Sequence, residues 1–213
     1  MSRFFPGKGG GRLRPRSFFE LPGKGDMAAI LAQSTGRRFD PSLILGPAAR
    51  CSWGLPSVIA CAPLRAGNPF PTTFWLTCPH LVRLCGSLES SGEVARLDAA
   101  VACDRSGWTA YNLLHARLRL MLVAAPQAVF LRKYRKSVWD VLRKGGVGGI
   151  NYSYASGGGA KCLHLHAASL LALGFHPEKD RLDKILTPLY CEIPPAECAE
   201  HLKDRKETSH VEG

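Results

Sequence analysis

Residues 72–92 have the sequence TTFWLTCPHLVRLCGSLESSG, and this stretch decides the fold. Its first third is rich in β-branched and aromatic residues, which favours a strand over residues 72–78. Pro79 suits the first turn of a helix, where its missing N–H costs nothing. The apolar residues that follow recur at helical spacing up to Gly92, namely Leu81, Leu84, Cys85 and Leu88. The stretch therefore predicts a strand that leads directly into a helix.

The segments on either side extend this pattern. Upstream, short apolar runs between Gly and Pro turns predict two more strands, at residues 43–45 and 58–61. Downstream, helical periodicity predicts helices over about 93–103, 108–124, 127–144, 160–173 and 178–186. We therefore expect an α+β fold, a mostly helical single domain with a small N-terminal β-sheet.

The two ends of the chain differ from this middle part. Residues 1–40 are rich in Gly, Pro and Arg, so we expect a basic, disordered tail that either contacts nucleic acid or is simply solvated. Residues 41–190 form the predicted globular α+β domain. Residues 191–213 are charged beyond two prolines, and we expect a C-terminal tail there.

Composition limits the class of protein. The chain has 213 residues, 46% of them hydrophobic, and a formal net charge of +11. This composition excludes a wholly disordered or fibrous protein, and the charge favours an anionic ligand or nucleic acid as partner. A chain of this size does not need disulfides, and we find no secretory signal and no membrane span, since Arg119 and Pro126 interrupt the most apolar stretch. We expect a cytoplasmic protein whose eight cysteines are reduced.

Cys78 lies where the predicted strand becomes a helix. A helix N-terminus lowers the pKa of a thiol, so Cys78 is a candidate nucleophile or metal ligand. The alternative is a small buried residue at a tight turn.

A second Cys/His stretch is denser. Residues 161–166 have the sequence KCLHLH. One interpretation is that Cys162 and His164 bind zinc together with Cys78. The other is that these side chains are hydrogen-bonded residues of the core. His115 is a further candidate, as a base or as a hydrogen-bonded core residue. An enzyme would use Cys78 or Cys162 as thiolate and His164 or His115 as base.

The glycine-rich loop before this stretch is a candidate anion site. Gly158, Gly159 and Lys161 offer backbone N–H groups and a positive charge to a phosphate or carboxylate. The loop lacks the residues of a P-loop, because Ala160 precedes the lysine and Cys162 follows it. A plain flexible loop is the alternative.

A basic run supports a different function. Arg132, Lys133, Arg135 and Lys136 surround Tyr134, and such a segment can bind nucleic acid through phosphate contacts and base stacking. In that case the Cys/His residues are structural. The alternative is a solvated helix face.

Two blocks of the sequence resemble a bacterial family of unknown function, the one numbered five hundred and one. The first is Gly67-Asn68-Pro69-Phe70-Pro71-Thr72 with Trp75-Leu76-Thr77-Cys78-Pro79, and the second is Lys161-Cys162-Leu163-His164. The resemblance covers roughly residues 48–180. It implies no established activity, but it places Cys78, Cys162, His164 and His115 at motif positions. Ser169 and His176 depart from the pattern, where the family tends to have His and Asn.

Overall fold

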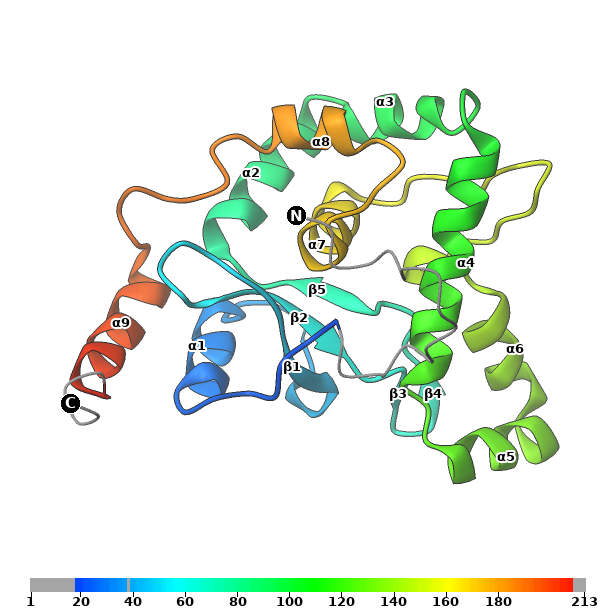
Figure 1. The fold of residues 1–213 in the computed structure, drawn as a ribbon, viewed down its shortest axis with the longest axis horizontal. Helices are drawn as coiled ribbons and strands as arrows, with labels where there is room; N and C mark the ends of the chain where they lie inside the picture. Colours follow the sequence, from blue (N-terminus) through cyan, green and yellow to red (C-terminus); the bar gives the residue numbers. More distant parts are fainter. Residues whose placement is uncertain (1–17, 38, 209–213) are drawn as a thin grey trace, which may run out of the picture.

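The computed structural model describes residues 18–37 and 39–208, and it confirms a mostly helical α+β domain with a small sheet near the N-terminus (Figure 1). The expected strands are β1 (Ile44–Arg50), β2 (Pro56–Cys61) and β5 (Phe74–Leu76). They pair antiparallel in the order β1-β2-β5, so β5 is an edge strand. A separate hairpin pairs β3 (Leu64–Arg65) with β4 (Asn68–Pro69).

The sheet is covered on both faces. All six residues of β2 are buried, and the last four alternate between two clusters. Val58 and Ala60 belong to the main core, whereas Ile59 and Cys61 pack with Ile30 of α1 (Asp26–Gln33) on the other side. The alternation follows from the period of two in a strand.

Parts of both expected tails are folded. Helix α1 lies within the expected 1–40 tail, and its buried Asp26 pairs with Arg50 of β1 at 2.8 Å. Helix α9 (Ala196–Thr208) lies within the expected C-terminal tail and packs on α1, where Cys198 is buried. Residues 1–17 and 209–213 of these tails lie outside the described residues.

The remaining helices largely follow the predicted periodicity. They are α2 (Pro79–Ser90), α3 (Glu93–Ala100), α4 (Arg105–Met121), α5 (Ala125–Tyr134), α6 (Lys136–Lys144), α7 (Leu163–Leu173) and α8 (Lys179–Ile185), with 3₁₀ turns at Pro41–Leu43 and Val147–Gly149. The expected 127–144 helix is two helices, because the backbone of Arg135 leaves the helical region (φ −133°, ψ 53°).

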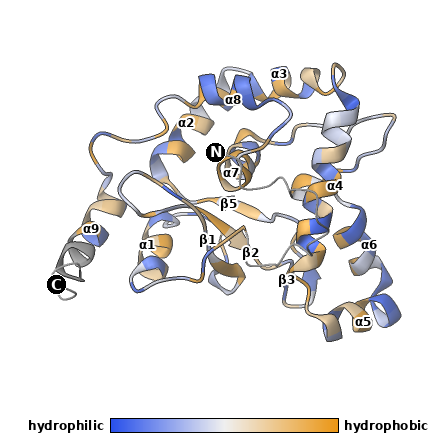
Figure 2. Cartoon of the chain, in the orientation of Figure 1, coloured by the Kyte–Doolittle hydropathy of each residue, from blue (hydrophilic) through white to orange (hydrophobic). Residues whose placement is uncertain are grey.

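Helix α7 is the central helix of the domain. It is seen end-on in Figure 1, above the sheet, and it packs against both β5 and α2. Helix α7 is apolar on almost every side, which explains its central position. Figure 2 shows α7 and β2 largely orange, while α8 is largely blue. The central position of α7 brings its N-terminus to the edge strand β5.

Within the described residues, no single helix is long and apolar enough to cross a bilayer. Helices α4 and α5 reach that length and apolar composition only when taken together, and they are bent by 108° at their junction.

Candidate metal centre

The first turn of α7 receives its cap from another helix. Cys162 is the N-cap residue and has an extended backbone. The backbone N–H groups of Leu163 and His164 donate to Oε1 of Glu89, at 2.6 and 3.4 Å. Glu89 lies in the last turn of α2. A carboxylate at a helix N-terminus is favoured by the helix dipole, so Glu89 joins the end of α2 to the start of α7.

The imidazole of His164 is fixed between two acceptors. Its Nδ1 lies 2.9 Å from Oε1 of Glu89, and its Nε2 lies 3.1 Å from the carbonyl oxygen of Val82. A carboxylate and a carbonyl only accept hydrogen bonds, so each ring nitrogen faces an acceptor. The ring therefore has a fixed orientation beside the carboxylate.

Three ligand types meet at this point. One atom each from Glu89, Cys162 and His164 lies within 4.8 Å of the other two. In a tetrahedral zinc site with bonds of about 2.0–2.3 Å, neighbouring ligand atoms are about 3.3–3.7 Å apart. The 2.9 Å between His164 Nδ1 and Glu89 Oε1 must therefore widen by about half an ångström to admit an ion. The donor types are ones that zinc binds, and the spacing would suit an ion after this change.

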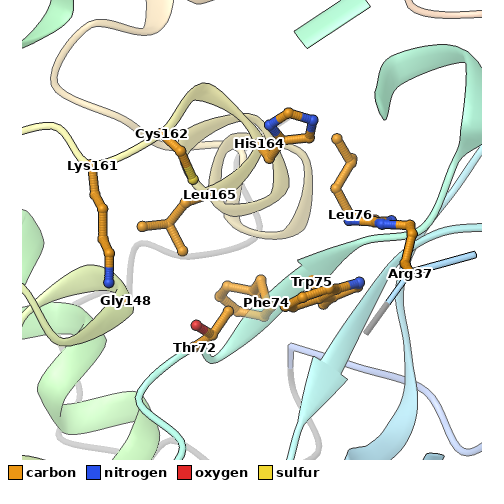
Figure 3. Close-up of a pocket in the computed structure, with 10 residues that line it drawn as sticks. All are labelled: Arg37, Thr72, Phe74, Trp75, Leu76, Gly148, Lys161, Cys162, His164 and Leu165. Atoms are coloured by element: carbon orange, nitrogen blue, oxygen red, sulfur yellow. The ribbon is translucent and has the colours of Figure 1, made fainter. Parts of the chain in front are cut away.

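A pocket of about 300 Å³ is lined by two of the three residues, Cys162 and His164. It lies between the start of α7 and the edge strand β5 (Figure 3). Its lining residues are Arg37, Thr72, Phe74, Trp75, Leu76, Gly148, Lys161, Cys162, His164 and Leu165. Gly148 is needed at its position, because its φ is +55° and a Cβ there would lie 2.6 Å from Leu165.

Burial has the largest effect on the pKa of the Cys162 thiol. Desolvation raises its pKa, and the charge of Glu89 raises it further. The N–H groups of Leu165 and His164 and the charge of Lys161 lower the pKa, but they do not offset burial. Without a metal ion, Cys162 is therefore a protonated thiol at neutral pH.

Cys78 has a different environment. It is the N-cap residue of α2 and is only 6% exposed. The expected lowering of its pKa is wrong, because desolvation raises the pKa to about 11 despite the N–H groups of Leu81 and His80. Among the described residues, Cys78 neither lines the pocket nor belongs to the three-residue group. The structure does not bring it to Cys162 as a third ligand.

His115 lies in the core. Its Nε2 is 2.8 Å from the hydroxyl of Ser169, and desolvation lowers its pKa to about 3. Close by, Nδ1 of His166 lies 2.9 Å from Nε2 of His176. Tyr111 contacts all three imidazole rings. His115 is thus part of a buried, neutral aromatic cluster rather than of the pocket.

The glycine loop is only partly available to an anion. The N–H of Gly158 points to the hydroxyl of Ser156 at 3.3 Å, and that of Ala160 donates to Asp98 at 2.8 Å. A Cβ on Gly159 would lie 2.9 Å from the same carboxylate. Of the three predicted anion-binding residues, Lys161 is the one that lines the pocket.

The predicted nucleic-acid-binding residues lie elsewhere. Arg132, Lys133, Arg135 and Lys136 are exposed where α5 meets α6, at the lower right of Figure 1. Arg119, a neighbour of this run in the sequence, is instead 1% exposed and donates to the carbonyl oxygens of Gly145 and Gly146.

From the sequence, Glu89 is only a weaker participant in the site, because it lies about three turns along the helix that follows Cys78, and nothing points to Arg37. A signal for Glu89 existed, because α7 begins without a Ser, Thr, Asp or Asn N-cap and its free N–H groups need an acceptor from elsewhere. Arg37 stands in a short polar stretch with no motif, and no sequence signal points to the pocket.

Residues 47–181 match the family described as a protein of unknown function, DUF501. The chain belongs to the DUF501 family. The match spans more than half of the chain, confirms the resemblance, and includes Glu89, Cys162 and His164. Arg37 lies outside the DUF501 match. No curated protein and no solved structure matches the chain.

Proposed function

We propose that this DUF501 protein binds one zinc ion through Glu89, Cys162 and His164, and that the ion acts on a ligand in the adjoining pocket. One observation carries the proposal: one atom each of Glu89, Cys162 and His164 lies within 4.8 Å of the other two, and Cys162 and His164 line a pocket of about 300 Å³. Zinc sites with three protein ligands keep a fourth position for water or substrate. The pocket is the space in which that position would be used.

The chemistry of the three residues supports an ion. Zinc binding displaces the proton of the Cys162 thiol and uses a nitrogen of His164 that carries no proton, so the ion competes with protons for these ligands. A zinc-bound water ionises near neutral pH, which favours hydrolysis or hydration as the reaction class. Glu89 contributes its negative charge and holds the ring of His164 in place.

A thiol enzyme has less support. A Cys/His pair needs a ring nitrogen directed at the thiol. Both nitrogens of His164 are taken, by Glu89 and by Val82. Cys162 has a raised pKa, and the alternative base His115 is buried beside Ser169.

Metal analysis tests the proposal. The purified protein, freed of metal by a chelator and then dialysed with a small excess of zinc, is expected to retain one ion per chain. Cobalt in place of zinc is expected to give the near-ultraviolet charge-transfer band of a metal–thiolate bond. The variants Cys162→Ser and His164→Gln are each expected to abolish stoichiometric binding and, for Cys162→Ser, the band.

Two matched variants serve as controls. Cys103→Ser changes an exposed cysteine and is expected to bind zinc as the wild type does. Cys78→Ser tests the sequence-based prediction of Cys78 as a second cysteine ligand, and we expect no loss of zinc. A folded protein that retains no zinc would contradict the proposal and leave the three residues with a structural role alone.

A second candidate function is single-stranded nucleic-acid binding at the junction of α5 and α6. Phe130 and Tyr134 are 51% and 60% exposed, and their rings are 5.3 Å apart. Four exposed cations surround them, Arg132, Lys133, Arg135 and Lys136. Exposed aromatic rings amid basic side chains suit base stacking and phosphate contacts.

Salt dependence tests this second function. Binding of a single-stranded oligonucleotide is expected to weaken steeply as salt rises, because neutralised phosphates release counterions. Changing Arg132, Lys133, Arg135 and Lys136 to Ala is expected to weaken it at least tenfold. Equal mobility of the oligonucleotide with and without protein at low salt would reject this function.

We also propose a cytoplasmic location. All eight cysteines are free thiols in the structure, and a reducing compartment preserves them. Fractionation of cells that express the full chain tests this proposal.

A further inference from the structure

Two positively charged residues line the pocket besides the proposed ligands Cys162 and His164. Arg37 follows α1 in the chain, and Lys161 precedes α7. In Figure 3 the two side chains lie at opposite ends of the pocket, with Phe74 and Trp75 on one side between them and Leu165 on the other. Any ligand next to Cys162 and His164 therefore lies between two cations.

Arg37 is held in place without a counter-charge. Its Nη1 donates to the carbonyl oxygen of Leu76 at 2.6 Å, and its guanidinium lies 5.0 Å from the centre of the Trp75 ring. Burial lowers its pKa. Within the described part of the chain, no carboxylate pairs with it, although other arginines have such partners, namely Arg50, Arg65, Arg96, Arg143 and Arg181.

Lys161 is in a similar situation. It has no carboxylate partner in residues 18–37 and 39–208. Asp98 of α3, whose carboxylate reaches the same loop, accepts a hydrogen bond from the N–H of Ala160 instead. A half-buried guanidinium and an ammonium without acids leave the pocket positively charged, and each retains N–H donors for a ligand.

We infer that the pocket binds a small organic anion, a phosphate or carboxylate with an apolar body, whose charged group pairs with Arg37 and Lys161. The inference rests on the proposed zinc centre for its place in a reaction, and it adds the class of substrate. Phe74, Trp75 and Leu165 pack against the apolar body. Arg37 presents a planar set of donors and Lys161 a point charge, which together fit an oxyanion. Because Arg37 lies outside the DUF501 match, this specificity includes a residue from outside the family domain.

Calorimetric titration with three probes tests the inference. Phenyl phosphate and benzoate carry the two kinds of anionic group, and benzyl alcohol has the same ring without a charge. At low salt, phenyl phosphate or benzoate is expected to bind at least tenfold more tightly than benzyl alcohol. The tighter of the two anions identifies the group, and rising salt is expected to weaken its binding.

Substitutions locate the binding. Arg37→Gln and Lys161→Gln are each expected to weaken binding of the tighter anion about tenfold to a hundredfold, the range for a lost charged hydrogen bond. Arg37→Lys keeps the charge without the planar donors and is expected to be intermediate. Arg83→Gln is the matched control, since this exposed arginine of α2 does not line the pocket. It is expected to bind as the wild type does.

The zinc content of each variant separates this inference from the proposed function. Arg37→Gln and Lys161→Gln are expected to retain zinc, and the titrations are run on both zinc-loaded and chelator-treated protein. Anion binding without any zinc binding would reject the metal centre and keep the anion site. Equal binding of benzyl alcohol and phenyl phosphate, unchanged affinity in both variants, or no binding of either anion would overturn the anion site.

Discussion

Glu89 is a single residue that serves two helices. One of its oxygens lies within hydrogen-bond distance of the N–H groups of Leu163 and His164 and of the His164 ring. Leu163 is completely buried, so its N–H has no access to water when the carboxylate is removed. An unpaired buried donor costs more than an average hydrogen bond contributes. Glu89 is therefore a stabilising residue whether or not a metal ion binds.

The variants Glu89→Leu and Glu89→Gln test this role. We expect Glu89→Leu to lower the free energy of unfolding by about 1–3 kcal/mol, because it leaves the N–H groups at the start of α7 unpaired. Glu89→Gln keeps an acceptor oxygen and is expected to cost less, while weakening zinc binding. Urea denaturation measures both. Glu192→Leu changes an exposed glutamate, and an equal loss in that control would contradict the capping role.

The glycine loop is an element held by side chains of α4. Asn112 accepts from the N–H of Val147 at 2.9 Å and donates to the carbonyl oxygen of Gly157 at 3.0 Å, so it joins both halves of the loop. Arg119 adds bonds to the carbonyls of Gly145 and Gly146. Both side chains are buried. The loop supplies Gly148 and leads to Lys161, so α4 sets one wall of the pocket.

We expect Asn112→Ala to loosen this loop more than the rest of the domain. The substitution leaves an N–H and a carbonyl of the loop without a buried partner, at a cost of about 1–3 kcal/mol. Hydrogen exchange of residues 147–158 is expected to accelerate, and anion affinity to fall. Asn151→Ala is the matched control at an exposed position of the same loop. Equal exchange in both variants would refute the anchoring role.

At the scale of the whole molecule, buried histidines couple folding to pH. Desolvation lowers the pKa of His115 and His166 to about 3 and that of His176 to about 2. In the unfolded chain a histidine titrates near 6.5. Below that pH the unfolded state binds protons that the folded state excludes. The contribution of these histidines to stability is complete above pH 6.5 and is lost as the pH falls toward 3.

We therefore expect the free energy of unfolding to fall steeply below pH 6.5. Each histidine contributes up to about 1.4 kcal/mol per pH unit, so the slope reports how many remain neutral. His115→Gln keeps a partner for Ser169 without titrating and is expected to give a shallower slope. His80→Gln, at a partly exposed histidine, is the control. Denaturant titrations from pH 7 to pH 4 measure the slopes, and identical slopes for wild type and His115→Gln would contradict the assignment.

The sequence predicts a feature well when the residues that form it are close together in the chain. The strand and helix of residues 72–92 were predicted because β-branched residues, Pro79 and helical spacing all act within one turn or strand. Cys162 and His164 were found because they are neighbours in the chain. Glu89 lies 75 residues before His164, and its contact depends on how α2 packs on α7. The expected direction of the Cys78 pKa shift is wrong because it depends on how deeply the thiol is buried, and the depth of burial is a property of the whole fold.

The shared carboxylate also determines what sequence comparison within the family can reveal. Selection for a folded domain alone retains Glu89, since the start of α7 needs its oxygen. The side chain of Cys162 has no comparable structural role, because its thiol is only half-buried and makes no capping hydrogen bond to α7. In a lineage that lost the proposed ion, Cys162 would drift first and Glu89 would persist. Whether a relative keeps the cysteine, rather than the glutamate, therefore indicates whether it keeps the proposed zinc site.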